Sequence, residues 1–222
     1  MASREHSPRQ IIRLADLAPI AWSGEAGSSV DGPGGAGGKT REIASGDGWR
    51  LALTMIDSAG ALAAPGPGER VATLVDGELV ALRVGTPGAR PDAGQPVTEH
   101  PLERYRPFPY DGAAPAEVTL PTGPGVLLQA ETGPRESGEP LGARVTIMEL
   151  SKTRSLPLFG TEGGAQFGVL LEGRAVAHPG DGSGHPVEGA TAELAVFDAV
   201  RGSDDAPVLT GRGFVAVVDF TP

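Results

Sequence analysis

The chain contains no cysteine among its 222 residues. This absence excludes disulfide cross-links, thiolate catalysis and metal or iron–sulfur sites with cysteine ligands. Histidine is scarce as well, and the only four are His6, His100, His178 and His185. No two of them stand two residues apart, the spacing at which a strand directs two imidazoles towards one ion. We therefore expect no metal and no other cofactor.

Long apolar runs and clusters of positive charge are also missing. Apolar stretches such as 214–218 fall far short of the roughly 18 residues that a membrane-spanning helix needs. The N-terminus lacks the apolar core of a signal peptide. The 18 basic residues are scattered among 28 acidic ones, and the net charge of −10 disfavours binding to nucleic-acid phosphates. We expect a cytoplasmic protein that binds neither nucleic acid nor membrane.

Turn-forming residues are abundant instead. The chain has 34 glycines and 21 prolines. Such a composition favours many short strands and turns over long helices. Since 39% of the residues are hydrophobic, the chain can bury a core of one large or two small domains. The expected fold class is all-β.

Two neighbouring segments, 39–44 and 49–57, are predicted to be strands. In the second, apolar residues occupy both alternating sets of positions, so both faces should be covered. One face carries Trp49, Leu51, Leu53 and Met55, and the other carries Arg50, Ala52, Thr54 and Ile56. Because an unpaired buried charge is costly, Arg50 should have a partner.

The stretch Gly37-Gly38-Lys39-Thr40 also ends like a phosphate-binding loop, in which backbone N–H groups cradle the phosphate. The position of the first glycine of such a loop is Pro33, which has no N–H. The turn residues 45–48 would also break any helix that began at Thr40. We therefore interpret this stretch as β-structure and not as a nucleotide site.

Three elements together resemble the HutD/Ves family: Gly-Gly-x-Thr-Arg-Glu-Ile at 37–43, Trp-Arg-Leu at 49–51, and Arg70 before a strand ending in Asp76-Gly77. The start of the chain, around Trp22, fits as well. The resemblance implies a cupin-type double-stranded β-helix, usually two tandem barrels (a bicupin). It also implies a link to histidine utilisation, no established enzymatic reaction, and a proposed role in sensing a pathway metabolite.

The chain departs from the family pattern at several points. A Gly-rich insertion at 23–36 displaces the Asn that family members place after the Trp, and the segments 64–70 and 127–130 differ from the family's motifs. These departures leave open a different ligand or a degenerate pocket.

Two pairs of similar segments indicate an internal duplication. The segments 71–81 and 167–177 each place an acidic-Gly pair between apolar runs, which predicts hairpins at Asp76-Gly77 and Glu172-Gly173. The segments 120–128 and 208–216 each predict a turn followed by a closing strand.

The expected organisation is therefore a tandem of barrels. We expect a flexible N-terminus at 1–9 and a first barrel at 10–150 that includes the 23–36 insertion. A smaller second barrel at 151–222 would pack on the first.

The candidate ligand site lies in the first barrel. Arg41 and Arg50 could bind a carboxylate with their guanidinium forks. Glu42 would accept a hydrogen bond, Thr40 would supply a hydroxyl, and Arg70 would add a charge at the rim. Trp49 or Trp22 would form an apolar wall. The resemblance implies a small carboxylated metabolite of the urocanate or formiminoglutamate type as partner, bound without turnover.

Other interpretations stay open. Arg41, Glu42 and Arg50 could form a cross-strand ion-pair network that only ties strands together. The chain could also be a metal-independent cupin isomerase or lyase acting on a small acid, or a structural or partner-binding protein with a degenerate pocket. A homodimer is also left open.

Overall fold

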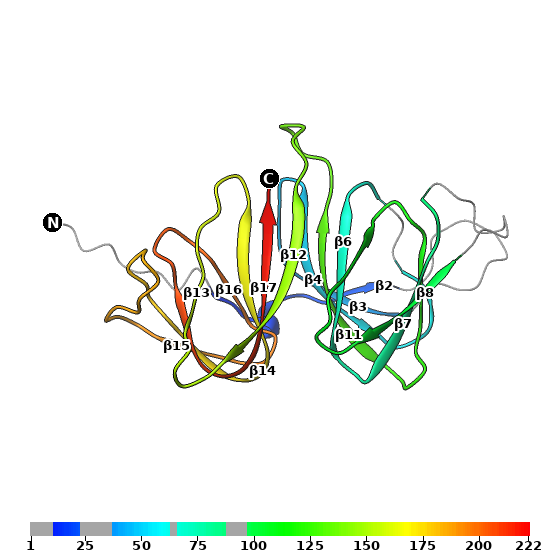
Figure 1. Cartoon of the computed structure of the whole chain (residues 1–222). Helices are drawn as coiled ribbons and strands as arrows, with labels where there is room; N and C mark the ends of the chain where they lie inside the picture. Colours follow the sequence, from blue (N-terminus) through cyan, green and yellow to red (C-terminus); the bar gives the residue numbers. More distant parts are fainter. Residues whose placement is uncertain (1–10, 23–36, 63–65, 88–96) are drawn as a thin grey trace. The chain divides into compact units, whose positions relative to one another are not determined.

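The computed structural model describes residues 11–22, 37–62, 66–87 and 97–222 (Figure 1). The predicted flexible segment 1–9 and the insertion 23–36 lie outside these residues. The chain forms two compact units, which we call the N-terminal unit, Ala18–Ala143, and the C-terminal unit, Met1–Leu17 with Arg144–Pro222. Residues 11–17 and 144–150 thus belong to the C-terminal unit, whereas the predicted first barrel included both.

Strands build both units, and the expected all-β class is confirmed. The sole helical element among the described residues is the single 3-10 turn η2, Leu14–Asp16. No helix in the described parts of the chain is long and apolar enough to cross a membrane.

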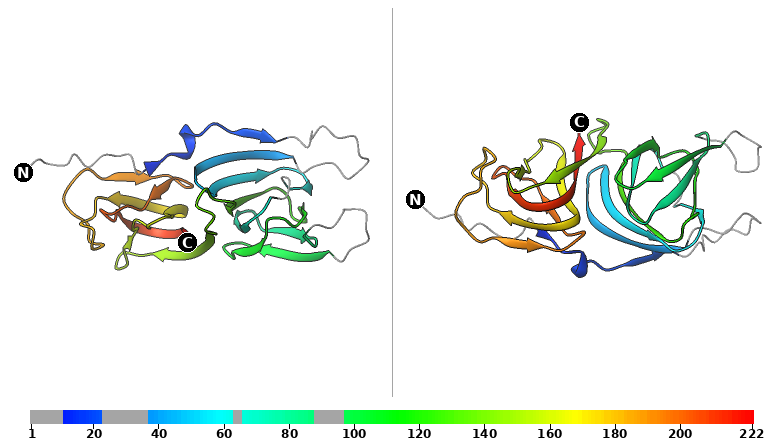
Figure 2. Two further views of the ribbon diagram at one scale, coloured as in Figure 1. Left: turned by 90° about the horizontal axis from the view of Figure 1, so that it is seen from above. Right: turned by 60° about the horizontal axis from the view of Figure 1, so that its bottom comes forward.

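The N-terminal unit consists of two antiparallel sheets that curve around a common interior (Figure 2). The six-stranded sheet has the order β2 (Ile20–Trp22), β3 (Gly38–Gly46), β4 (Trp49–Ile56), β11 (Gly125–Thr132), β6 (Glu69–Asp76), β9 (Phe108–Asp111). The four-stranded sheet has the order β5 (Gly60–Ala61), β10 (Ala116–Thr119), β7 (Leu79–Val84), β8 (Thr98–Glu103).

An apolar core joins these two sheets. Leu74 and Leu127 from the larger sheet and Leu82 and Leu102 from the smaller one belong to the same buried cluster, with exposed fractions of 1% or less. Burying a leucine side chain stabilises a fold by about 1.5–3 kcal/mol, so this shared cluster holds the sheets together.

The strand β4 agrees with the predicted alternation. Leu51 and Leu53 on one face and Thr54 and Ile56 on the other are all buried. Coverage of both faces is therefore confirmed for most of the strand. Met55 is the exception on the face of Leu51 and Leu53, since it is 44% exposed.

The predicted hairpin at Asp76-Gly77 is a turn, but it is not a paired hairpin. The strand β6 pairs with β11 and β9, while β7 pairs with β10 and β8, so the chain passes from one sheet to the other at this turn. Gly77 has φ +102°, a conformation that favours glycine. The acidic-Gly signal thus located the reversal of the chain without specifying the strand partners.

The C-terminal unit is built on a seven-stranded antiparallel sheet. Its main order is β1 (Ile11–Ile12), β16 (Ala199–Arg201), β14 (Ala165–His178), β17 (Val208–Thr221), β12 (Gly142–Leu150). In addition, β13 (Leu156–Pro157) pairs with β17, and β15 (Ala192–Leu194) pairs with β14. A separate apolar cluster around Leu170, Leu209 and Val215 forms its core.

The predicted hairpin at Glu172-Gly173 is wrong, as is the predicted turn at 210–213. β14 and β17 are continuous strands of 14 residues each, and they pair along their whole length. A β-bulge lies between Leu170 and Glu172, and Gly173, which follows it and pairs with Gly213, has φ +94°. A Cβ at Gly173 would lie 2.1 Å from the Arg212 carbonyl oxygen. Glycine here permits close approach of two strands and not a chain reversal.

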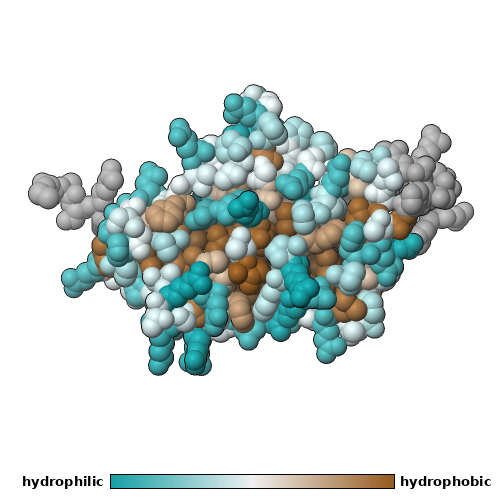
Figure 3. All heavy atoms as spheres, viewed as in Figure 1, coloured by the Kyte–Doolittle hydropathy of each residue, from teal (hydrophilic) through white to brown (hydrophobic). Residues whose placement is uncertain are grey.

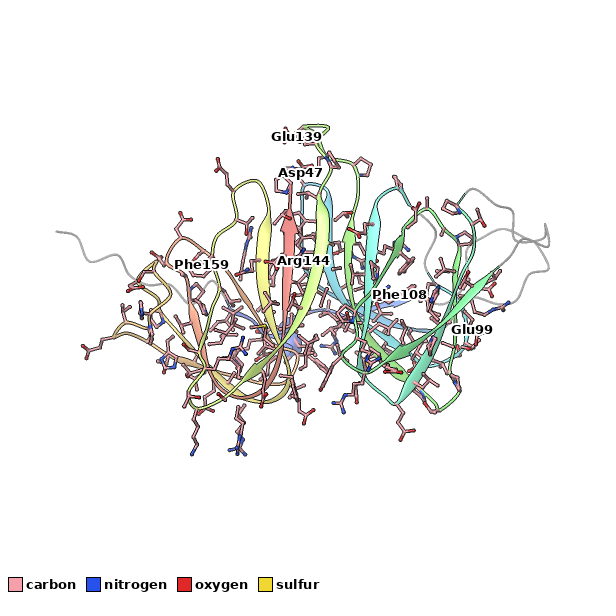
Figure 4. All side chains as sticks on the ribbon, viewed as in Figure 1. Asp47, Glu99, Phe108, Glu139, Arg144 and Phe159 are labelled. Carbon is pink, nitrogen blue, oxygen red and sulfur yellow. The ribbon has the colours of Figure 1, made fainter. Side chains whose placement is uncertain are left out.

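Hydrophobic and hydrophilic residues are mixed on the face shown in Figure 3. Among the described residues, the exposed large hydrophobic side chains are Ile20, Met55, Val97, Phe159 and Val196. Phe159 is labelled in Figure 4. These residues come from distant parts of the chain, and singly exposed apolar side chains are ordinary for a protein surface.

Candidate functional site

Polar side chains line up across five neighbouring strands of the six-stranded sheet. Ser45 of β3 lies opposite Arg50 of β4, Arg50 opposite Glu131 of β11, Glu131 opposite Arg70 of β6, and Arg70 opposite Tyr110 of β9. Residues directly opposite each other in a sheet project from the same face. We call these five residues the polar row.

The polar row lies on the interior face of the N-terminal unit. Arg70 precedes Ala72 and Leu74 at alternate positions of β6, and both of these are core residues. Glu131 follows Leu127 in the same way on β11. Since successive side chains of a strand alternate between faces, the row continues the interior face at one end of the apolar core.

Arg50 is the centre of an ion-pair network. Its Nε lies 3.0 Å from Glu42 Oε2 and its Nη1 lies 3.5 Å from Glu131 Oε2. The expectation that this arginine needs a partner is confirmed. The Ser45 hydroxyl donates to Glu42 Oε1 at 2.7 Å. This hydrogen bond is the main cause that lowers the pKa of Glu42, and Arg50 adds to it against the opposing effect of burial.

A second polar chain lies deeper on the same face. Thr40 Oγ1 is 3.1 Å from Thr54 Oγ1, and the Thr54 hydroxyl donates to Gln129 Oε1. All three side chains are buried. These groups satisfy one another, so the chain of hydrogen bonds fixes the strands β3, β4 and β11 in register.

Tyr110 ends the polar row with a buried hydroxyl. The residue is 7% exposed, and its Oη has no hydrogen-bond partner among the described residues. Burial raises the pKa of the phenol, while the nearby Arg70 guanidinium acts in the opposite direction without forming a hydrogen bond of good geometry. The ring stacks on Phe108, with centroids 6.4 Å apart. The hydroxyl is therefore held in place as a free donor towards the interior.

The predicted site residues are only partly brought together. Glu42, Arg50 and Arg70 share the interior face, and Thr40 lies on it but is bonded to Thr54. Arg41 is adjacent to Thr40 and Glu42 on β3 and lies on the other face, so it does not join Arg50.

The tryptophans do not form the predicted wall of the polar row. Trp49 is buried on the face opposite to Arg50, with its indole against Gly46, where a Cβ would be 2.5 Å from Nε1. The backbone of Trp22 pairs with Gly38. Its side chain lies outside what the structure describes.

Five residues of the site were missed from the sequence: Ser45, Thr54, Tyr110, Gln129 and Glu131. A signal existed for two of them, because Gln129 and Glu131 stand at alternate positions after Leu127 in a strand that is otherwise largely apolar. Tyr110 comes from a short strand in a proline-rich segment, and nothing local marks it.

No group of three His, Asp or Glu side chains that could hold a metal ion occurs in the described parts of the chain. The polar row and the neighbouring Glu42 together offer two guanidinium groups, two carboxylates and one phenol. This set can bind a carboxylate at the arginines and the phenol, and an N–H group at the carboxylates.

The sequence itself matches no protein-family model and no curated protein. Solved structures do match. HutD from Pseudomonas fluorescens SBW25, in a formate condition, has a TM-score of 0.64 at 19% identity, with 95% of this chain and 97% of that chain covered. A conserved protein of unknown function from Pseudomonas aeruginosa PAO1 has a TM-score of 0.66 at 22% identity, covering 96% and 98%.

A formate complex of Lactobacillus farciminis oxalate decarboxylase is also similar, with a TM-score of 0.62 at 7% identity, covering 97% of this chain and 87% of that one. At these identities the likeness concerns the fold, and the predicted cupin fold is confirmed. The chain has a HutD-like cupin fold.

Proposed function

We propose that the N-terminal unit binds a small carboxylated metabolite at the polar row. The observation that carries this proposal is the placement of Arg50, Arg70 and the buried Tyr110 hydroxyl on one interior face. Guanidinium groups bind carboxylates through charge-assisted hydrogen bonds, and these are stronger where water is excluded. The Tyr110 hydroxyl supplies a donor that no described residue satisfies.

The same row favours a ligand with a second polar end. Glu42 and Glu131 accept hydrogen bonds and face the network from β3 and β11. A molecule with a carboxylate at one end and an N–H-bearing group at the other complements this arrangement. Urocanate and formiminoglutamate, intermediates of histidine breakdown, have this chemistry. The likeness to a HutD structure and to a formate complex supports the choice of this class.

On this proposal the protein is not an enzyme and modulates histidine utilisation by holding an intermediate, as the resemblance to the HutD/Ves family implies. It is also a bicupin, in which each unit is one cupin barrel. The two separate apolar cores support that division.

Isothermal titration with urocanate and formiminoglutamate tests the binding proposal, with imidazole as the ligand that lacks a carboxylate. We expect both acids to bind and imidazole to bind at least tenfold more weakly. Arg70→Gln should weaken binding of the acids tenfold or more, because it removes a charge-assisted contact.

Arg83→Gln is the matched control. Arg83 belongs to the same unit but pairs with Glu99 and Glu117 at the surface, so its removal should leave affinity unchanged. If neither acid binds the intact protein, the proposal fails and the reading as a structural or partner-binding protein with a degenerate pocket is favoured.

A metal-independent isomerase or lyase is the second candidate. It is favoured by the position of Tyr110 in the polar row, where the phenol lies next to Arg70 and could donate a proton to a bound acid. Turnover of either acid in the presence of a chelator, lost in Tyr110→Phe while binding is retained, would establish this activity. Binding without turnover would favour the non-enzymatic role.

A further inference from the structure

A second candidate site lies in the C-terminal unit. A cleft of about 1150 Å³ opens there around β14, β15 and β17. Its charged lining residues are four basic and one acidic: Arg13, Lys152, Arg174, Arg212 and Glu193. The basic residues are scattered along the sequence. Folding gathers these four in one cleft of a chain whose net charge is −10.

Arg174 and Arg212 form the centre of this positive charge. They are directly opposite each other on β14 and β17, and both side chains are exposed. Like charges that face each other across two strands repel. Neither guanidinium, nor the Lys152 ammonium, makes an ion pair with a described residue. An anion between the two guanidinium groups would remove the repulsion and accept hydrogen bonds from both.

The rest of the lining suits a small organic molecule. Hydroxyl groups in the lining are held by hydrogen bonds, between Ser151 and Thr153 and from Thr210 to His178. Leu194 and Val196 offer apolar surface. Arg13 is held in position, since its Nη1 lies 2.6 Å from the buried Asp198 carboxylate. Clefts that combine apolar walls with a few fixed polar groups are typical of small-molecule sites.

We propose that this cleft binds a small organic dianion, with its negative group between Arg174 and Arg212 and its apolar part against Leu194 and Val196. Three cationic groups without a described ion-pair partner favour two negative charges over one. Phosphate monoesters and dicarboxylates share this chemistry. This cleft and the polar row share no residue and lie in different units. The proposal for the cleft can therefore fail while the proposal for the polar row holds, and the reverse.

Isothermal titration of the full chain at low ionic strength tests the site, with phenyl phosphate, phthalate and benzoate as probes of similar size. We expect at least one of the two dianions to bind, and benzoate to bind at least tenfold more weakly than that dianion. The stronger of the two dianions identifies the source of the charge as phosphate or dicarboxylate. No binding of either dianion, or equal binding of benzoate, would overturn the proposal.

Substitutions locate the binding. Arg174→Gln and Arg212→Gln should each weaken binding of the preferred dianion about tenfold or more, because each removes a charge-assisted contact. Both side chains are exposed, so circular dichroism and melting should show an intact fold. Arg144→Gln is the matched control, an exposed arginine of the same unit outside the cleft (Figure 4). An equal loss of affinity in Arg144→Gln would show nonspecific attraction and overturn the assignment.

Discussion

Replacing Tyr110 by phenylalanine should strengthen the fold while it weakens the proposed ligand binding. The hydroxyl is buried and has no partner among the described residues. A buried hydroxyl without a hydrogen bond costs about 1–3 kcal/mol relative to its hydrated state. Phenylalanine keeps the ring and its stacking on Phe108. We therefore expect Tyr110→Phe to raise the free energy of unfolding by about 1 kcal/mol.

Urea unfolding followed by tryptophan fluorescence measures this change, because Trp22 and Trp49 both belong to the N-terminal unit that contains Tyr110. For a chain of this size, about 1 kcal/mol corresponds to a melting-point increase of roughly 2–4 °C. Tyr105→Phe is the control, since the Tyr105 hydroxyl accepts a hydrogen bond from Arg104 at 2.8 Å at the exposed surface. Its stability should change by less than about 0.5 kcal/mol.

The opposite sign would refute the reasoning. If Tyr110→Phe lowered stability by about 1 kcal/mol, the hydroxyl would have to be hydrogen-bonded within the protein, and it could not serve as a free donor. A rise in stability without any loss of affinity for urocanate or formiminoglutamate would separate Tyr110 from the binding site.

The remaining predictions concern pH, backbone and charge. The pKa of Glu42 is lowered in the fold, so its contribution to stability is present above its unfolded pKa and is lost as the pH falls through the folded pKa. The melting temperature of Glu42→Gln should therefore fall less steeply than that of the unsubstituted protein on acidification below about pH 4.5. Gly173→Ala should cost more than about 2 kcal/mol in urea unfolding, because its φ is +94° and a Cβ would lie 2.1 Å from the Arg212 carbonyl oxygen. Gly123→Ala, at φ +115° with no atom within 4 Å of the added Cβ, should cost clearly less in the same assay. Arg212→Glu should raise the melting temperature by an amount corresponding to about 0.5 kcal/mol, because it places a carboxylate directly opposite the Arg174 guanidinium. The same substitution should abolish measurable binding of phenyl phosphate and phthalate.

The sequence predicted the parts of the fold that depend on local pattern. The abundance of glycine and proline and the alternation in 49–57 correctly indicated short strands and an all-β chain. The predicted partner of Arg50 was also found, because a charge in a covered strand must be neutralised wherever the strand pairs.

These local signals did not predict which strands pair. Glycine after an acidic residue indicates a positive φ, and both Gly77 and Gly173 have one. At Gly77 the chain turns between sheets, whereas at Gly173 it continues along β14, because β17 is available as a partner on both sides of this residue. Only the tertiary partner decides between these outcomes.

The candidate site shows the same limit. Arg41 and Arg50 looked equivalent in the sequence, yet the parity of β3 and β4 in the paired sheet places them on different faces. Glu131 and Tyr110 join the site through register with β4 and β6, over sequence separations that no motif spans.

The division of the chain into two units also determines which fragments can fold and in which order the units can form during synthesis. The C-terminal unit takes β1 from before the N-terminal unit and pairs it with β16, near the other end of the sequence. During synthesis the whole N-terminal unit is therefore completed before Val200 and Ala199, the strand partners of Ile11 and Ile12, have been made. A fragment that starts at Arg144 would keep the buried Asp198 but lose Arg13, leaving a carboxylate of 2% exposure without its cation. The two units are thus separable only by two cuts or by circular permutation, and a single cut at residue 143 should yield a C-terminal fragment that folds poorly.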